Sequence, residues 1–278
     1  MTKTDHWIPK YWNSSAMFSD HRQYFSQAFK PSITSSWQDW PDCNELNRLW
    51  PNSNRTLSGY LTRFMPQSSL SETTLYYEEH IFSTGEIPTR AQNWHDFFNA
   101  QVWLQFPKIK SVINAQHVEE IAKNGLRHNQ ANRPRKRDAL TLFDESGVIF
   151  VSSDEQVIKD LKNHHWETLF WKKRQQWWQS ISVYIVGHSL YEKALSPYVG
   201  MTAKALPLLV EESFFDQDIT SKTAELDNRI ANEIKCEKLL ELPSSLCPLP
   251  VLGIPQWWPQ NNDLSFYANK DYFRPVKK

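Results

Sequence analysis

Glycine is scarce in this chain, with 7 residues among 278. None of the glycines forms the GxGxxG or GxxxxGK[ST] spacing of the loops that hold dinucleotides and nucleoside triphosphates. The sequence therefore excludes these two common phosphate-binding loops. Any phosphate that the protein binds must be held by side chains or by helix ends.

Cysteines and long apolar runs are also few. The three cysteines, Cys43, Cys236 and Cys247, form no CxxC pair, which argues against a disulfide framework and against a zinc knuckle. Apolar runs such as 205–210 are too short to span a bilayer, and the first residues contain no apolar signal-peptide core. We therefore expect reduced thiols in a cytoplasmic protein that does not enter a membrane.

A net charge is absent as well, because 31 Lys and Arg residues balance 31 Asp and Glu residues. Binding to nucleic acid or to a membrane surface would therefore need a local basic patch. What the chain does have is a hydrophobic content of 40% and an aromatic content of 14%, which are typical of an ordered globular protein with a large core.

The order of helical and strand-like patterns predicts an α+β fold. We expect a mainly helical, single compact unit with a β-hairpin and a few further strands. Residues 1–89 are expected to form a helical and irregular region packed on a main α+β domain, residues 90–278. The clearest elements are two successive helices: Asn93 caps the first, Pro107 ends it, and the second runs over 109–124.

Other elements are predicted from residue type and turn signals. The aromatic and β-branched segment 73–83 indicates a strand, and the runs ALTLF and VIFVS on either side of DESG indicate a hairpin over 139–152. A strand is expected at 182–186. Helices are expected from about Asp154 with Ser153 in a capping box, over 166–178, over 189–195 and over 216–241.

The segment NWHDFFN places polar side chains at the start of the first helix. His95 and Asn99 are four residues apart and Asp96 and Asn99 are three apart, so a helix brings them to adjoining parts of one face. Beside the positive end of the helix dipole, they suit a general acid/base histidine or an anion site. The alternative is a solvated helix start in which His95 bonds to a backbone carbonyl.

The second helix carries His117, and the short connection between the helices predicts that His95 and His117 approach each other. Two histidines with a carboxylate have the ligand chemistry for a divalent metal, but their spacing matches no HExxH-type motif. We therefore keep a metal at His95 and His117 as an alternative that is not favoured. The other alternative is that His117 is an ordinary helix residue.

The segment YIVGHSLYEKAL predicts a strand, a glycine and a helix. Gly187, His188 and Ser189 resemble the start of the G-x-S-x-G nucleophile elbow, but Tyr191 occupies the place of its last glycine, which argues against Ser189 as a nucleophile. Glu192 lies four residues after His188 and can orient its ring. The alternative is a polar helix start with an ordinary hydrogen bond.

Five basic residues and no acidic residue lie between Arg127 and Arg137. This loop can hold phosphate or, together with the tryptophan- and lysine-rich segment 166–178, contact nucleic acid. The alternatives are a solvated loop and tryptophans buried in the core. Asp144 and Glu145 are interpreted as turn residues of the predicted hairpin.

Several unusual strings occur in one order between about Arg90 and Pro275: NWHDFFNAQVWLQFPKIKSVINAQH, RDALTLFDESGVIFVSSD, ETLFWKKR, VGHSLYEKALSPYVGMTAKAL and LPVLGIPQWWP. Together they resemble an uncharacterised bacterial family, the domain of unknown function 3025. The resemblance implies a bacterial, cytoplasmic, single-domain protein, and it supplies neither a reaction nor a catalytic residue. Its polar motif positions include Lys110, Asn114, Thr141, Asp144, Glu145 and Lys193.

The polar motifs lead to one main hypothesis. We expect an enzyme that performs acid/base or metal-assisted hydrolytic chemistry on a small anionic substrate in one cleft. Its candidate catalytic residues are His95, Asp96, His117, His188 and Glu192, and its candidate substrate-binding residues are Asn99, Arg137, Asp138 and Lys204. The alternatives are a non-enzymatic protein that binds nucleic acid or an acidic partner through 127–137 and 166–178, and polar motifs with a purely structural role.

Overall fold

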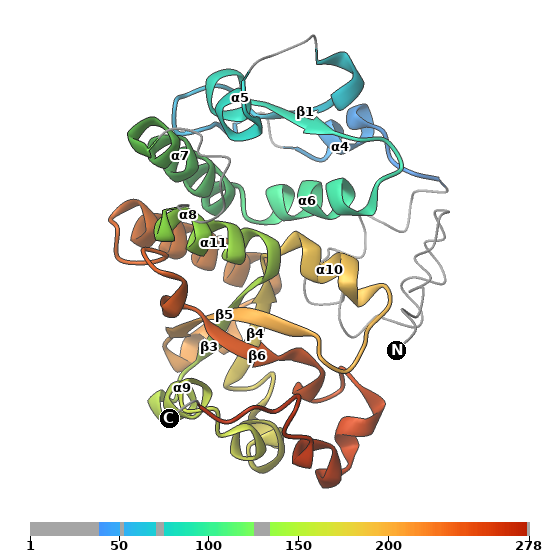
Figure 1. Cartoon of the computed structure of the whole chain (residues 1–278), viewed down its shortest axis with the longest axis vertical. Coiled ribbons are helices and arrows are strands. Elements are labelled where there is room, and N and C mark those ends of the chain that lie inside the picture. Colours follow the sequence, from blue (N-terminus) through green and yellow to red (C-terminus); the bar gives the residue numbers. More distant parts are fainter. Residues whose placement is uncertain (1–38, 51–52, 71–74, 125–133, 277–278) are drawn as a thin grey trace.

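A four-stranded mixed sheet lies between two groups of helices in the computed structural model (Figure 1), which describes residues 39–50, 53–70, 75–124 and 134–276. The strand order is β4-β3-β5-β6, where β3 is Gly147–Ser152, β4 Ile181–Ile185, β5 Thr202–Leu209 and β6 Cys247–Pro250. The central strands β3 and β5 are parallel, and both outer strands pair in antiparallel fashion. Every residue of β3 and β4 is buried, so the sheet lies at the centre of the core.

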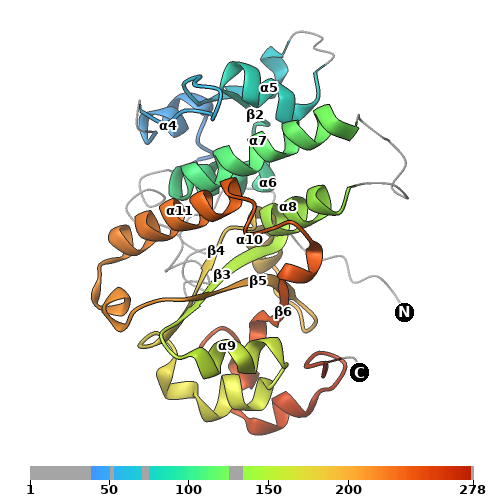
Figure 2. The same ribbon diagram turned by 90° about the vertical axis from the view of Figure 1, so that its left-hand side faces the viewer.

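Helices cover both faces of the sheet (Figures 1 and 2). One side carries α6 (Trp94–Gln105), α7 (Pro107–Asn124), α8 (Arg135–Ser146), α10 (His188–Ala194) and α11 (Ile219–Lys235). The other side carries α9 (Glu155–Lys162) and the π-helix Glu167–Lys172. Short 3₁₀ helices span Gln67–Ser69, Arg174–Gln176, Glu212–Asp216, Pro243–Ser245, Val251–Gly253, Pro259–Asn262 and Leu264–Ala268.

A smaller unit packs on α6 from the side opposite the sheet (Figure 1). It contains α4 (Cys43–Arg48), α5 (Tyr77–Thr84) and the parallel strands β1 (Arg63–Pro66) and β2 (Glu86–Thr89). Its own apolar cluster includes Ala100 and Trp103 of α6, while Phe97 and Phe98 of α6 belong to the main core. Helix α6 is thus buried on two faces, which fixes the position of its first turn.

The α+β class is confirmed, and so are the two successive helices. The side chain of Asn93 accepts a hydrogen bond of 3.0 Å from the Asp96 backbone N–H, as expected of a helix cap. Pro107 begins α7 directly, because proline at a first helical position loses no hydrogen bond. The carboxylate of Asp227 on α11 accepts from the backbone N–H groups of Lys108 and Ile109 at 3.1 and 2.8 Å, which fixes the start of α7.

The predicted hairpin over 139–152 is wrong. Residues 135–146 form α8, whose buried residues Lys136, Ala139, Leu140 and Phe143 follow a helical spacing, and only VIFVS is a strand. The segment DESG is therefore a helix end and not a turn. The strand predicted over 73–83 is also wrong where the structure describes it, because 77–84 is α5, and Gly85 ends that helix at φ 76°.

The helices predicted from about Asp154, over 189–195 and over 216–241 are confirmed with shifted ends, and the single helix predicted over 166–178 is not. Asp154 caps α9 in place of Ser153, and the long polar helix is shorter than 216–241. The helix expected over 166–178 is broken into a π-helix and a 3₁₀ turn. The strand β4 and the short helix α10 lie where they were expected. Among the described residues, no helix combines the length and the apolar character that a membrane span needs.

Candidate functional site

A cavity of about 430 Å³ opens where the smaller unit meets α6, α7, α8 and α10. Five of the predicted site residues line it, namely His95, Asp96, Asn99, His117 and His188. The cavity is also lined by Thr141, Asp144 and Glu145, which were family motif positions but not predicted site residues, and by Tyr76, Tyr77 and Glu78, which the sequence did not single out. Five helices that are distant along the chain thus contribute polar side chains to one site.

Two glycines bring the end of α8 against the start of α10. The backbone N–H groups of Val186 and Gly187 donate to the Gly147 carbonyl at 3.0 and 2.8 Å. A Cβ atom on Gly187 would lie 2.4 Å from the backbone nitrogen of Gly147, so only glycine permits this approach. As a result Glu145, at the end of α8, and His188, at the start of α10, face the same space.

Two histidines of the cavity, His95 and His188, face each other through their Nε2 atoms. The Nε2 atoms of His95 and His188 are 3.0 Å apart, and the rings are nearly perpendicular. The Nδ1 atoms face carboxylates: His95 Nδ1 lies 3.0 Å from Glu192 Oε2, and His188 Nδ1 lies 3.8 Å from Asp144 Oδ2. Glu192 thus orients the His95 ring through a hydrogen bond, whereas His188 Nδ1 is within ion-pair distance of Asp144 but forms no hydrogen bond with the described residues.

The surroundings shift the pKa values of the two rings in opposite directions. The hydrogen bond with Glu192 is the main reason why the pKa of His95 lies above its usual range. Burial lowers the pKa of His188 to about 4, so this ring is neutral at physiological pH. A neutral ring can present a lone pair at Nε2.

Glu145 supplies a carboxylate beside the histidine pair. Its Oε1 atom lies 3.7 Å from His188 Nε2, and the Ser189 hydroxyl donates to its other oxygen. Ser189 Oγ is also 3.4 Å from His95 Nδ1. One ligand atom from each of His95, Glu145 and His188 falls within 4.8 Å of the others, which is the spacing of side chains that can hold one metal ion.

The arrangement fits the geometry of a divalent metal site. Two nitrogens about 2.1 Å from an ion are about 3.0 Å apart in neighbouring octahedral positions and about 3.4 Å apart in the tetrahedral geometry typical of zinc. The 3.0 Å between the two Nε2 atoms therefore matches octahedral positions and is slightly short for tetrahedral zinc. Two histidines and one carboxylate also form a common ligand set for zinc and for iron. Carboxylates behind metal-binding histidines are a recurring outer shell that fixes the ring orientation.

Two further carboxylates of the cavity are neutralised by basic side chains. Asp144 pairs with the buried Lys110, and the charges of Lys110 and His188 outweigh burial and hold the pKa of Asp144 below its usual range. Arg90 contacts both carboxylate oxygens of Asp96 at 2.7 and 2.9 Å. Asp96 therefore fixes Arg90 and does not orient His95. Glu192 orients His95 instead.

Glu78 on α5 contributes a carboxyl group with an unusual pKa. Asn114 donates to its Oε2 atom at 2.6 Å, and burial raises the pKa of Glu78 to about 7. Nearby, Asn99 donates to the Tyr77 hydroxyl at 3.1 Å, and burial raises the pKa of Tyr77. This wall of the cavity therefore holds a carboxyl group that changes charge near neutral pH.

Three predicted substrate-binding residues do not line the cavity. Lys204 lies on β5 with its Cα atom opposite Gly147, and Asp138 lies on α8. Arg137, also on α8, holds its guanidinium 6.0 Å from the ring centre of Tyr76, which does line the cavity. Residues 127–133 of the predicted basic loop lie outside the described residues, and Arg135 to Arg137 begin α8.

The aromatic segment proposed for nucleic-acid stacking is part of the core. Trp166 and Trp177 are 5% and 3% exposed and stack on the buried Phe170. Their indole N–H groups donate to backbone carbonyls of Arg274 and Leu169. These rings are buried anchors and offer no stacking surface for bases.

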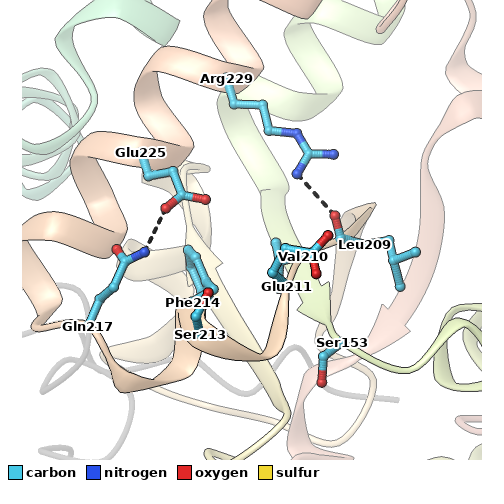
Figure 3. A pocket seen from close by; sticks show the side chains of 9 residues that line it. All are labelled: Ser153, Leu209, Val210, Glu211, Ser213, Phe214, Gln217, Glu225 and Arg229. Carbon is cyan, nitrogen blue, oxygen red and sulfur yellow. Dashed lines mark hydrogen bonds between the residues drawn. The ribbon is translucent and has the colours of Figure 1, made fainter.

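A separate cavity of about 470 Å³ lies beside the start of α11 (Figure 3). Its polar groups are engaged with one another: Gln217 donates to Glu225 at 2.8 Å, and Arg229 donates to the Leu209 carbonyl at 3.0 Å. None of the predicted site residues lines it. The chemistry-bearing side chains are therefore those of the histidine cavity.

Sequence reasoning considered Glu145 and Ser189 but placed neither in the predicted site. The predicted hairpin placed Glu145 in a turn, whereas the helical spacing of the buried residues in 136–143 could have placed it at a helix end. Ser189 was excluded as a nucleophile elbow because of Tyr191, and that argument did not cover a supporting contact with a carboxylate. No local signal places Glu145 beside two histidines that lie on two other helices.

Comparison with known proteins identifies a family to which no reaction is assigned. No curated protein and no solved structure matches the chain. A family model does match, and it covers residues 62–277, which is well over half of the chain and begins before the resemblance recognised at Arg90. The chain therefore belongs to the family described as protein of unknown function (DUF3025).

Proposed function

We propose that the protein is a hydrolase that uses a divalent metal ion held by His95, Glu145 and His188. The observation that carries this proposal is the convergence of the two Nε2 atoms at 3.0 Å while both Nδ1 atoms face carboxylates. The hydrogen bond between His95 Nδ1 and Glu192 fixes the ring with its Nε2 atom facing His188 and Glu145, which is the orientation that a ligand to a shared ion needs. We further propose that the protein works in the bacterial cytoplasm.

The side chains suit this chemistry. A divalent ion at this position would supply Lewis acidity and lower the pKa of a bound water. Glu192 accepts from His95 Nδ1 and so fixes the tautomer of the neutral ring that carries its lone pair at Nε2, although the same contact raises the pKa of His95 and the ring must lose a proton before it can bind an ion. The low pKa of His188 keeps that ring neutral. Ser189 orients Glu145 through its hydroxyl. The protein thus prepares three ligand atoms before an ion arrives.

The charge balance of the cavity supports a small anionic substrate once an ion is bound. Asp144 and Asp96 are neutralised by Lys110 and Arg90, respectively. Among the described residues, the only ion pairs of Glu145 and Glu192 are with histidines. A divalent ion would offset these two charges, and an anion could then bind at the open coordination positions.

A metal-free mechanism is the second candidate. His95, held by Glu192, would act as a general base, and Ser189 Oγ lies within 3.4 Å of its ring. Glu145 argues against this mechanism because it already accepts the Ser189 hydroxyl. Metal content separates the two candidates.

The test is a metal-binding measurement on the purified full-length chain. Elemental analysis should find close to one equivalent of zinc, iron or manganese, and zinc titration by calorimetry should give one site. His95→Ala, His188→Ala and Glu145→Gln should each weaken zinc binding by more than about 100-fold, the upper end of the cost of losing an outer-shell contact. The exposed His165, which pairs with Asp160, provides the control variant His165→Ala.

Activity is measured on the same preparations with p-nitrophenyl phosphate and p-nitrophenyl acetate as general probes. Hydrolysis should be lost after treatment with a chelator and should return with zinc or manganese. Equal zinc binding by the native chain and the His95→Ala, His188→Ala double variant would show that the proposal is wrong. Hydrolysis that survives the chelator and is lost in Ser189→Ala would favour the metal-free candidate.

A further inference from the structure

Arg137 is a buried cation that has no ionic or hydrogen-bond partner among the residues that the structure describes. It is 6% exposed, its guanidinium forms no ion pair or hydrogen bond with the described residues, and its Nε atom is buried. The other buried cations of the described chain are paired: Lys110 with Asp144, and Lys136 with both Glu237 and Glu241.

An unpaired charge in this position is costly. Charged groups that are removed from water are normally paired or hydrogen-bonded, because desolvation otherwise costs several kcal/mol, roughly. The contact with the Tyr76 ring, at 6.0 Å, offsets only part of such a cost. A ligand that brings a negative charge would complete the environment of Arg137.

The position of Arg137 connects it to the histidine cavity. Tyr76, over whose ring the guanidinium lies, lines the cavity, and so does Thr141, one helical turn after Arg137 on α8. Glu78 lines the same wall, and the charge of Arg137 acts on its carboxyl group. Arg137 does not itself line the cavity but lies next to the wall formed by α5 and α8, in contact with the Tyr76 ring, while Glu145 lies at the end of α8.

We infer that Arg137 binds an oxyanion of the substrate, a carboxylate or a phosphate group, at the wall formed by α5 and α8. The planar guanidinium can donate two parallel hydrogen bonds to such a group, which a lysine cannot do. The inference rests on the proposed function only in taking this cavity as the place where substrate binds. It deepens that proposal by naming a second anchor point on the substrate, separate from the metal ligands.

Anion binding is tested by calorimetry with sulfate as the tetrahedral probe and acetate as the planar probe, on metal-free and zinc-loaded full-length chain. Arg137→Met, which keeps the bulk and removes the charge, should weaken binding of the preferred anion at least about tenfold, consistent with the loss of a charge-assisted hydrogen bond. Arg135→Met makes the same change at an exposed position of the same helix and should leave binding within about twofold. Preference for sulfate indicates a phosphate group, and preference for acetate indicates a carboxylate.

Thermal unfolding gives a second readout. Without anion, Arg137→Met should unfold at a higher temperature than the native chain, because it removes an uncompensated buried charge. A structural role predicts a lower unfolding temperature. If Arg137→Met does not fold, Arg137→Lys keeps the charge without the fork and should still weaken anion binding.

The outcomes separate this inference from the proposed function. Anion binding that depends on Arg137 but persists in the His95→Ala, His188→Ala double variant supports the inference even if no metal binds. Anion binding seen only with zinc and unchanged in Arg137→Met would place the anion on the ion and overturn the inference. Absence of binding for both anions would overturn it as well.

Discussion

At the scale of single residues, the site depends on how side chains of the same type acquire different pKa values and so different protonation states. His95 and His188 are 3.0 Å apart, yet Glu192 raises the pKa of one and burial lowers the pKa of the other. Glu78 and Asp144 differ in the same way, because Lys110 forms an ion pair with Asp144 while Asn114 offers Glu78 only a neutral hydrogen bond. Burial and the nearest charge decide each state.

Glu78 should make anion binding at Arg137 depend on pH. Its carboxyl faces Asn114, Lys110 and His117 of α7 and Arg137 and Asp144 of α8. Because its pKa is about 7, Glu78 is mostly neutral at about pH 6 and mostly ionised at about pH 8. The negative charge opposes an anion at Arg137, so sulfate binding should weaken as pH rises, by up to about tenfold per pH unit.

The measurement is the dissociation constant of sulfate for metal-free protein across this pH range. Sulfate keeps its charge throughout, so the protein alone supplies the titration. Glu78→Gln mimics the neutral carboxyl group and should bind sulfate with little pH dependence. An unchanged pH dependence in Glu78→Gln would assign the effect to another group, such as His117.

The residue types of the site were largely predictable, and their pairing was not. Hydrogen-bonding side chains at a capped helix start identified His95, and spacing identified His188 with Glu192. The pairing differs, since Glu192 orients His95 and Asp144 faces His188. Helical spacing describes neighbours on one helix, whereas these contacts join α6 to α10 and α8 to α10.

At the scale of elements, helix caps were the reliable signals, and local propensity was not. Asn93 caps α6 as predicted, whereas α9 is capped by Asp154 and not by the predicted Ser153, one residue earlier. The run ALTLF has residues typical of strands, but its burial in α8 follows a helical period. Tertiary packing against the core therefore overrode the intrinsic preference.

The contact between α8 and α10 makes Gly187 a sensitive position. In Gly187→Ala, the new Cβ atom would lie 2.4 Å from the Gly147 nitrogen, a backbone atom that cannot move without shifting β3. We expect a loss of stability of about 1–3 kcal/mol, as in overpacked cores, together with weaker zinc binding, since Glu145 and His188 move apart.

The control is Gly59→Ala, at positive φ but with no atom within 4 Å of the new Cβ atom. This change should cost about 1 kcal/mol through backbone strain alone and leave zinc binding intact. Urea unfolding and zinc calorimetry measure both effects. Zinc binding that is equally strong in Gly187→Ala would mean that the close approach of the two glycines does not position the ligands.

At the scale of the whole molecule, the three proposed metal ligands come from two parts of the fold: the sheet with its flanking helices, and the helix α6 on which the smaller unit packs. His95 lies on α6, which shares its core with the smaller unit, whereas Glu145 and His188 flank strands of the sheet. Two apolar clusters meet along α6: the apolar residues of its first turn pack in the main core, and Ala100 and Trp103 farther along pack in the cluster of the smaller unit. An ion bound at His95 would therefore link α8 and α10 to the helix that carries the smaller unit.

Zinc should therefore stabilise the folded chain as a whole. At a free concentration about 100 times the dissociation constant, binding to the folded state adds about 2.7 kcal/mol. For a chain of this size, about 2–4 °C per kcal/mol gives a rise of roughly 5–10 °C in the unfolding midpoint. Differential scanning calorimetry with and without zinc measures this rise. The His95→Ala, His188→Ala double variant should show none, and an equal rise in that variant would locate the stabilising ion elsewhere in the molecule.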